Sequence, residues 1–139
     1  MLLHYKLPPE PSALRVYIWR KLKRLGAIYH QDSVWVLPNN THTREQFQWL
    51  AAEINELGGE AALWDAQQGL AGKDDTLVEM FQQLVDQTYL EILKRLELPD
   101  PDLDSLSRQY QQTRLKDYFQ SGLGQQVQQV LLARRGVEL

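Results

Sequence analysis

The stretch from Pro11 to Pro38, PSALRVYIWRKLKRLGAIYHQDSVWVLP, predicts an amphipathic helix followed directly by a β-hairpin. Ser12 is a suitable helix N-cap, and the prolines that precede it cannot lie inside a helix. Gly26 supplies the left-handed residue with which many helices end. The apolar side chains recur at the spacing of one helical face: Leu14, Ile18, Leu22 and Leu25.

Strand signals flank this helix on both sides. After it, 27–30 and 33–37 are short β-prone runs around Gln31-Asp32, the length of a two-residue hairpin loop. Before it, Leu2–Leu7 is a strand candidate in which Leu3, Tyr5 and Leu7 share one face.

A second helix and a fourth strand follow the hairpin. Thr43 with Gln46 matches a capping box, and Gly58-Gly59 ends the helix before a strand at 60–65. The helical stripe consists of Phe47, Leu50, Ala51, Ile54 and Leu57. The order strand, helix, strand, strand, helix, strand is that of an α+β, ferredoxin-like βαββαβ sandwich, whose helices cover one face of the sheet.

The rest of the chain predicts helices. We expect a ferredoxin-like domain over 1–68, a glycine-containing linker, and a helical extension over 74–139 packed on the bare face of the sheet. Asp75 or Thr76 is the expected cap of its first helix, which ends near Glu97. That helix carries the apolar residues Leu77, Phe81, Leu84 and Ile92. The later helices would run from 103 to 119, with Leu106 and Tyr110, and to 135, with Val127, Val130 and Leu131.

Composition excludes several classes of function. The chain has no apolar run near the ~20 residues of a membrane helix. It has no cysteine, which excludes disulfides and thiol chemistry and agrees with a cytoplasmic protein. His4, His30 and His42 lack metal-site spacing, and the carboxylates form no recognisable acid/base pair. We therefore expect no metal, no cofactor, no membrane association and no catalysis.

Positive charge is concentrated in the first helix. Residues 1–30 carry six Lys or Arg against one acid, a balance of +5, although the whole chain is at −3. Arg20, Lys23 and Arg24 lie opposite the leucine stripe, with Arg15 and Lys21 towards its edges. The helix therefore turns a cationic back outward. This surface could attract phosphates or an acidic partner, or it could be an ordinary solvated face.

The tryptophans divide into two groups. Trp19 and Val16 fall off the leucine face among the cations, where Trp19 could stack on a base or a partner's ring, or be covered by a C-terminal helix. Trp35 and Trp64, in predicted strands, are expected in the core or covering the sheet. Trp49 lies off the main stripe of its helix and is a weaker candidate contact.

Three segments carry a family resemblance: YKLPPEPSALRVYIWRKLKRLGA (5–27), SVWVLP (33–38) and EQFQWLAAEINELGGEA (45–61). They resemble the N-terminal domain of the chromate-resistance regulator ChrB, and the helical run with LKDYFQSG (115–122) is similar to the remainder of that domain. The helix and hairpin are also similar to the domain of PaaX-type repressors and of CRISPR adaptation ribonucleases. In those ribonucleases an aspartate ends the first strand, where this chain has Tyr5-Lys6-Leu7-Pro8.

The resemblance implies a transcriptional regulator of chromate-efflux genes. On this hypothesis the chain forms a homodimer and contributes to double-stranded DNA binding by contacting phosphates. The contacting residues would be Arg15, Trp19, Arg20, Lys21, Lys23 and Arg24, with Arg44 as a possible addition. The alternative is a protein-interaction module whose same face docks a separate sensor domain or another partner. A third, enzymatic interpretation is a metal-dependent nuclease whose site residues form no recognisable group in the sequence.

Overall fold

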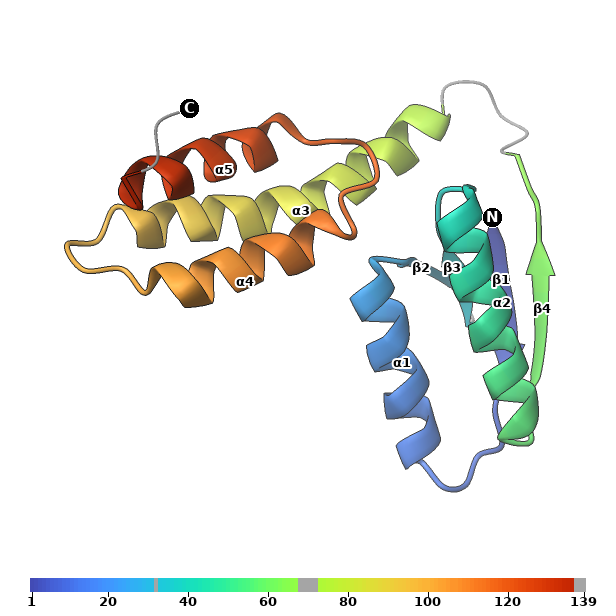
Figure 1. Cartoon of the computed structure of the whole chain (residues 1–139). Coiled ribbons are helices and arrows are strands. Elements are labelled where there is room, and N and C mark those ends of the chain that lie inside the picture. The colour runs from blue at the N-terminus through green and yellow to red at the C-terminus, as the bar shows by residue number, and fades with distance from the viewer. Residues whose placement is uncertain (32, 68–72, 137–139) are drawn as a thin grey trace. The chain divides into compact units, whose positions relative to one another are not determined.

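The computed structural model describes residues 1–31, 33–67 and 73–136 as two compact units, Met1–Lys73 and Asp74–Leu139. The first contains, in chain order, β1 (Leu2–Lys6), α1 (Ala13–Leu25), β2 (Ile28–Gln31), β3 (Val34–Val36), α2 (Thr41–Glu56) and β4 (Glu60–Trp64) (Figure 1). The second contains α3 (Lys73–Leu96), which begins at the last residue of the first unit, followed by α4 (Leu103–Arg114) and α5 (Gly122–Arg134).

The strands of the first unit form one antiparallel sheet in the order β2-β3-β1-β4. This order and the alternation of strands and helices give the predicted α+β, split βαβ arrangement. Leu3 lies opposite both Trp35 and Leu63, whereas His4 lies opposite Val34 and Ala62. Because alternate residues of a strand point to opposite faces, these two sets occupy the two faces of the sheet.

Helices α1 and α2 cover the face that carries Leu3 (Figure 1). The side chains that form the core beneath them are buried: Met1, Leu3, Trp35 and Leu37 from the sheet side, and Ile18, Leu22, Phe47, Leu50 and Ile54 from the helices. The helical stripes predicted from sequence supply these last residues. Trp64 was expected in the core or over the sheet, and its side chain is 59% exposed at the end of the edge strand β4.

The helix ends differ from the predicted caps. Ser12 makes no side-chain cap bond, because its backbone is already helical (φ −63°, ψ −21°) and not extended as a capping residue requires. Asn40 is extended and caps α2: it accepts from Thr43 N at 2.8 Å, and Thr43 Oγ1 accepts from Asn40 N at 3.0 Å. The predicted Thr43 and Gln46 capping box is therefore wrong. Gly26, at φ 77°, ends α1 as predicted.

The hairpin differs from prediction by a shift in its loop. Gln31 belongs to β2 and pairs with Val34, after an irregularity in register that follows Tyr29. Ser33 has a left-handed backbone with φ 62°. Asp32, the other residue of the predicted loop, lies outside the described residues.

The second unit has a core of its own. Its buried side chains are Val85, Tyr89, Ile92, Leu96, Leu106, Tyr110, Val127 and Leu131. Leu84, one of the apolar residues predicted along this helix, is exposed, because Phe81, Val85 and Tyr89 define the buried stripe at intervals of four. Helix α3 begins at Lys73, so the predicted caps at 75 and 76 are wrong, and α4 ends at Arg114 and not near 119. Residues 68–72, which include the glycines of the predicted linker, lie outside the described residues.

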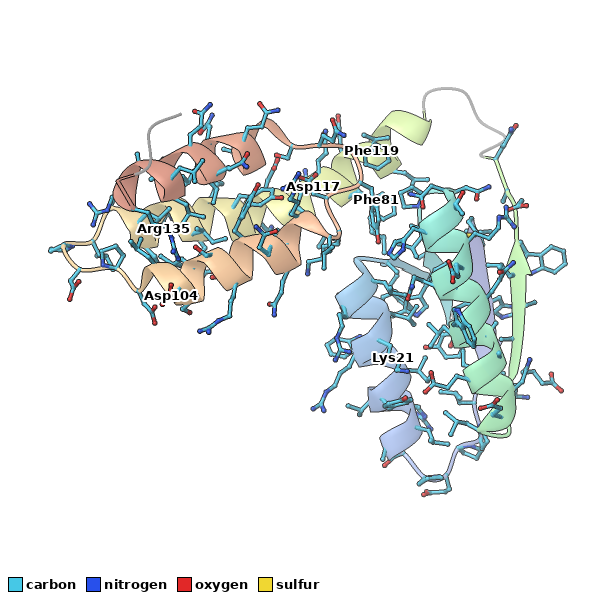
Figure 2. All side chains as sticks on the ribbon, in the orientation of Figure 1. Lys21, Phe81, Asp104, Asp117, Phe119 and Arg135 are labelled. Atoms are coloured by element: carbon cyan, nitrogen blue, oxygen red, sulfur yellow. The ribbon has the colours of Figure 1, made fainter. Side chains whose placement is uncertain are left out.

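Polar contacts close this helical unit at both ends. The Tyr89 hydroxyl donates to Asp117 Oδ2 at 2.9 Å, and the Ser121 backbone N–H donates to Asp117 Oδ1 at 3.0 Å. Arg135 forms an ion pair with Asp104 at 2.9 Å (Figure 2).

An aromatic contact joins α3 to the segment after α4: the ring of Phe81 lies beside that of Phe119, with 5.9 Å between centroids (Figure 2).

Candidate functional site

Helix α1 buries its apolar stripe and exposes most of its cations. Ile18 and Leu22 are fully buried, while Leu14 and Leu25 are half-buried. On the outside lie Arg15, Trp19, Arg20, Lys23 and Arg24, all exposed. Among the described residues, none of these four basic side chains forms an ion pair with a carboxylate.

Two of the predicted site residues form ion pairs with acidic side chains of the same unit. Lys21 Nζ lies 2.5 Å from Glu53 Oε2 of α2, and the Tyr17 hydroxyl donates to the other oxygen of that carboxylate. Arg44 lies 2.6 Å from Asp65 Oδ1. Their charges are therefore partly neutralised, and we place Lys21 and Arg44 outside the free cationic surface.

The Lys21 and Glu53 pair shifts both of its pKa values in the direction of an ion pair. The hydrogen bond to Glu53, together with the Tyr17 hydroxyl, raises the pKa of Lys21 above its ordinary value of 10.5. Burial alone would raise the pKa of Glu53, but the bonds from Lys21 and Tyr17 outweigh it and lower that pKa below 4.5. The pair ties α1 to α2 near neutral pH.

The remaining basic residues separate into two stripes on α1. Arg15, Trp19 and Lys23 follow one another at intervals of four and line a cleft of about 1570 Å³. Arg20 and Arg24 form the second stripe and do not line this cleft. The sequence interpretation treated all of them as one surface, whereas the fold divides them.

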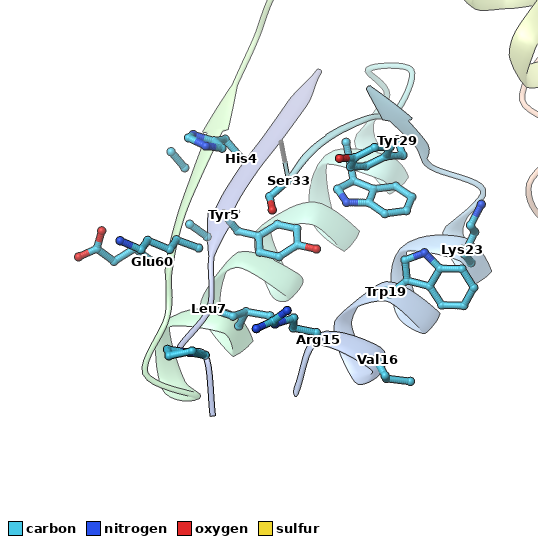
Figure 3. Close-up of a pocket in the computed structure, with 15 residues that line it drawn as sticks. His4, Tyr5, Leu7, Arg15, Val16, Trp19, Lys23, Tyr29, Ser33 and Glu60 are labelled. Carbon is cyan, nitrogen blue, oxygen red and sulfur yellow. The ribbon is translucent and has the colours of Figure 1, made fainter. Parts of the chain in front are cut away.

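The cleft lies between α1, the hairpin and the end of β1 (Figure 3). Tyr5, Arg15, Trp19 and Tyr29 surround a common space in this view. The full lining is His4, Tyr5, Lys6, Leu7, Pro9, Arg15, Val16, Trp19, Lys23, Tyr29, Ser33, Trp35, Glu60, Ala61 and Ala62. Strand β3 begins only at Val34, so the hairpin side of β1 is open beyond Tyr5, whose N–H donates to Ser33 O at 3.3 Å.

Aromatic rings and the Lys23 ammonium group lie close together in the cleft. The centroids of the Tyr29 and Trp35 rings lie 5.3 Å apart in an edge-to-face arrangement. Lys23 Nζ lies 5.5 Å from the Trp19 centroid and 5.9 Å from the Trp35 centroid. Trp19 is 49% exposed and Tyr29 52%, whereas Trp35 is only 2% exposed. Two open rings therefore stand above a buried one.

Polar groups at the base of the cleft are incompletely paired. Burial raises the pKa of Tyr5, and the nearby Trp35 side chain opposes this rise. Trp35 Nε1 nevertheless makes no hydrogen bond of normal geometry with a described residue, the Tyr5 hydroxyl included. Trp35 Nε1 is consequently a buried donor without a partner among the described residues.

Sequence reasoning found Arg15, Trp19 and Lys23 but missed the sheet side of the cleft. Tyr5, Tyr29 and Trp35 come from three different strands. The hairpin itself carried a usable signal, since antiparallel pairing places Tyr29 opposite Trp35. Tyr5 joins them only through the pairing of β1 with β3, which no local pattern indicates.

In the described part of the chain, no group of three or more His, Asp or Glu side chains could hold a metal ion. Within the same residues, no helix is long and apolar enough to cross a bilayer.

The chain matches one known protein family over most of its length. The family described as "Protein ChrB, N-terminal" matches residues 15–97, more than half of the chain. The chain belongs to the ChrB N-terminal domain family. No curated protein and no solved structure matched it, and the likeness to PaaX-type repressors and CRISPR adaptation ribonucleases remains a prediction.

The ChrB family match extends across both units. It runs from Arg15 in α1 to Glu97, just after the end of α3, and so includes the whole hairpin and α2. Strand β1, with Tyr5, precedes the matched residues. Family membership identifies the chain as a regulatory module associated with chromate resistance, a class of domain that is regulatory and not enzymatic.

Proposed function

We propose that this member of the ChrB N-terminal domain family is a non-enzymatic cytoplasmic module that forms homodimers and contacts the backbone of double-stranded DNA. It would thereby contribute to regulating resistance to chromate or related oxyanions. Support comes from family membership and from those exposed cations of α1 that form no ion pair with a described residue. Contacts of this kind position a protein on DNA without reading its sequence.

The observation that carries the proposal is the stripe of Arg20 and Arg24. These side chains lie opposite the buried Ile18 and Leu22, are exposed, and pair with no described carboxylate. Each guanidinium can therefore replace a counterion at a DNA phosphate. Arg15 and Lys23 would add to this binding from the neighbouring stripe.

The salt dependence of duplex binding tests this stripe. Each lost phosphate contact lowers the slope of log K against log salt concentration by about 0.9. Changing Arg20→Ala and Arg24→Ala together should therefore reduce the slope by roughly 1.8, with little change between duplex sequences. An unchanged slope would remove this stripe from the DNA-binding proposal.

A matched control removes the same charge from elsewhere. Lys94 and Arg108 are exposed side chains of α3 and α4. The double change Lys94→Ala and Arg108→Ala should leave the duplex salt slope close to that of the wild type. An equal loss in both double variants would indicate a general charge effect and count against a DNA-binding helix.

Dimerisation is a separate part of the proposal. The two edge strands of the sheet, β2 and β4, each pair with one other strand only, and the exposed Trp64 lies on β4. Sedimentation equilibrium across a wide concentration range should show a dimer. A monomer at every concentration would overturn this part while leaving DNA contact testable.

A second candidate function is the docking of a separate sensor domain or another protein. The exposed apolar side chains of α1, Val16, Tyr17 and Trp19, favour it, because such residues anchor protein interfaces. Retention on heparin or plain duplex DNA at low salt separates the two candidates. Failure to bind either polyanion would favour protein docking.

A further inference from the structure

We infer that the cleft between α1 and the β-hairpin binds nucleotides, stacking an unpaired base against Trp19 and Tyr29 and holding its phosphate with Arg15 and Lys23. This inference goes beyond the proposed contact with duplex backbone. The inference is also independent of that proposed duplex contact, because Arg20 and Arg24, which carry the proposal, lie outside the cleft.

Open aromatic rings are the first reason. Trp19 and Tyr29 are each about half exposed, although burial of such rings is strongly favourable. They stand on different elements, α1 and β2, and line the same cleft. Aromatic side chains placed in this way form stacking surfaces that accept any base, since every base has a π-face.

Charge gives the second reason. Among the described residues, the Lys and Arg side chains of the lining are Lys6, Arg15 and Lys23, against one carboxylate, Glu60. Lys23 Nζ lies within 6 Å of the centroids of two aromatic rings. The same cleft therefore offers flat apolar surface and positive charge side by side. A cationic ligand would be repelled, and a purely apolar one would leave the cations unused.

The size of the cleft indicates an extended occupant. Its volume of about 1570 Å³ exceeds the 300–1,000 Å³ of a typical small-molecule site. The lining continues from α1 past the end of β1 to His4 and Ala62, which lie on the opposite face of the sheet from Tyr5. A single strand of nucleic acid can follow such a path, whereas a free mononucleotide fills only part of it.

An unsatisfied donor at the base agrees with a polar ligand. Trp35 Nε1 is buried without a hydrogen-bond partner among the described residues, and the hydroxyls of Tyr5 and Ser33 lie in the same lining. Buried donors are normally paired. Base carbonyls and phosphate oxygens are acceptors that the hydroxyls of Tyr5 and Ser33 could meet on binding.

The experiment compares two fluorescent eight-nucleotide probes by anisotropy with the full chain. One is oligothymidylate, and the other has the same phosphates but abasic sites in place of the bases. We expect the wild type to bind oligothymidylate about tenfold or more tightly than the abasic probe. Trp19→Ala should abolish most of this difference, and Trp19→Phe should restore part of it.

A second tryptophan supplies the control. Trp49 is 68% exposed on α2 and does not line the cleft, so Trp49→Ala should keep the preference for bases. Thermal unfolding should show that Trp19→Ala remains folded. Equal binding of the two probes by the wild type, or an unchanged preference in Trp19→Ala, would overturn the inference.

Competition distinguishes the two sources of the nucleotide. Displacement of the probe by millimolar thymidine monophosphate would support the inference with a free nucleotide as the occupant. Binding of the strand that resists this competitor would support it with a strand segment. The duplex salt slope of Trp19→Ala should remain unchanged, so failure here and failure of the Arg20 and Arg24 test are separate results.

Discussion

The ammonium group of Lys23 lies 5.5 Å from the centroid of the Trp19 ring, one turn earlier on the same helix. The contact holds a positive charge at the mouth of the cleft without neutralising it, because an aromatic ring carries no net charge. Lys21, two residues before Lys23, is instead paired with Glu53. Neighbouring lysines of one helix thus differ in whether their charge is free to meet a ligand.

Lys23→Gln should weaken strand binding without unfolding the protein. One phosphate contact on a single strand contributes about 0.7 to the salt slope, so the variant should lose roughly that amount. The exposed cation–π contact contributes only about 0.5–1 kcal/mol to folding, and the loss of stability should be no larger. Salt titrations with oligothymidylate and a urea unfolding curve measure the two effects. An unchanged slope would place Lys23 outside the binding surface.

Glu53→Gln should remove a pH-dependent part of the stability. The pKa of Glu53 is lowered in the folded protein, so its carboxylate stabilises the fold above the unfolded-state pKa, and this is lost as pH falls through the lowered value. At neutral pH the variant should be less stable by about 1 kcal/mol or less, since the pair is partly exposed. The difference should close in urea unfolding curves between neutral pH and about pH 2.

Lys21, the basic partner of Glu53, sets the upper limit of the pH range in which the ion pair stabilises the fold. The pKa of Lys21 is raised, so its contribution is complete below its unfolded-state value and is lost only as pH rises through the raised value. Glu45→Gln is the matched control for Glu53→Gln, because Glu45 is exposed on the same helix, α2, and forms no ion pair among the described residues. A gap between wild type and Glu53→Gln that stays constant from neutral pH into acid would contradict the assignment.

Asn40→Ala and Ser12→Ala should differ, although both residues occupy N-cap positions. Asn40 accepts from Thr43 N at 2.8 Å, and loss of such a cap costs about 1 kcal/mol. Ser12 makes no side-chain cap bond, so Ser12→Ala should change stability by no more than about 0.5 kcal/mol. Denaturant unfolding of the two variants measures the contrast, and equal losses would show that the caps are misassigned.

The caps show how far local pattern predicts this fold. The periodic apolar stripes predicted both helices of the first unit, because burial of one face repeats along the helix and Ile18, Leu22, Phe47 and Ile54 indeed form the core. The ends were less predictable. Ser12 has the right side chain but a helical backbone, and its dihedrals are set by the surrounding chain and not by its own type.

The site was predicted only in part, for a related reason. Helical spacing correctly placed Arg15, Trp19 and Lys23 on the outside of α1. It could not show that Lys21 meets Glu53, 32 residues away, because that contact depends on how α1 and α2 pack. The aromatic floor of the cleft likewise depends on strand pairing, which joins Tyr5 to the hairpin.

Gly124→Ala and Gly122→Ala test the packing of the helical unit. A Cβ at Gly124 would lie 3.0 Å from Tyr89 Cζ and from its hydroxyl oxygen, whereas a Cβ at Gly122 meets nothing within 4 Å. Tyr89 is fully buried and its hydroxyl donates to Asp117, so its ring can move only by disturbing that bond. Overpacking of this kind costs about 1–3 kcal/mol, and Gly124→Ala should lose that much stability. Gly122→Ala, in the same helix, should be neutral or slightly stabilising because alanine favours helix over glycine. Urea unfolding followed by helical circular dichroism compares the two, and a Gly124→Ala variant as stable as Gly122→Ala would refute the close approach of α5 to Tyr89.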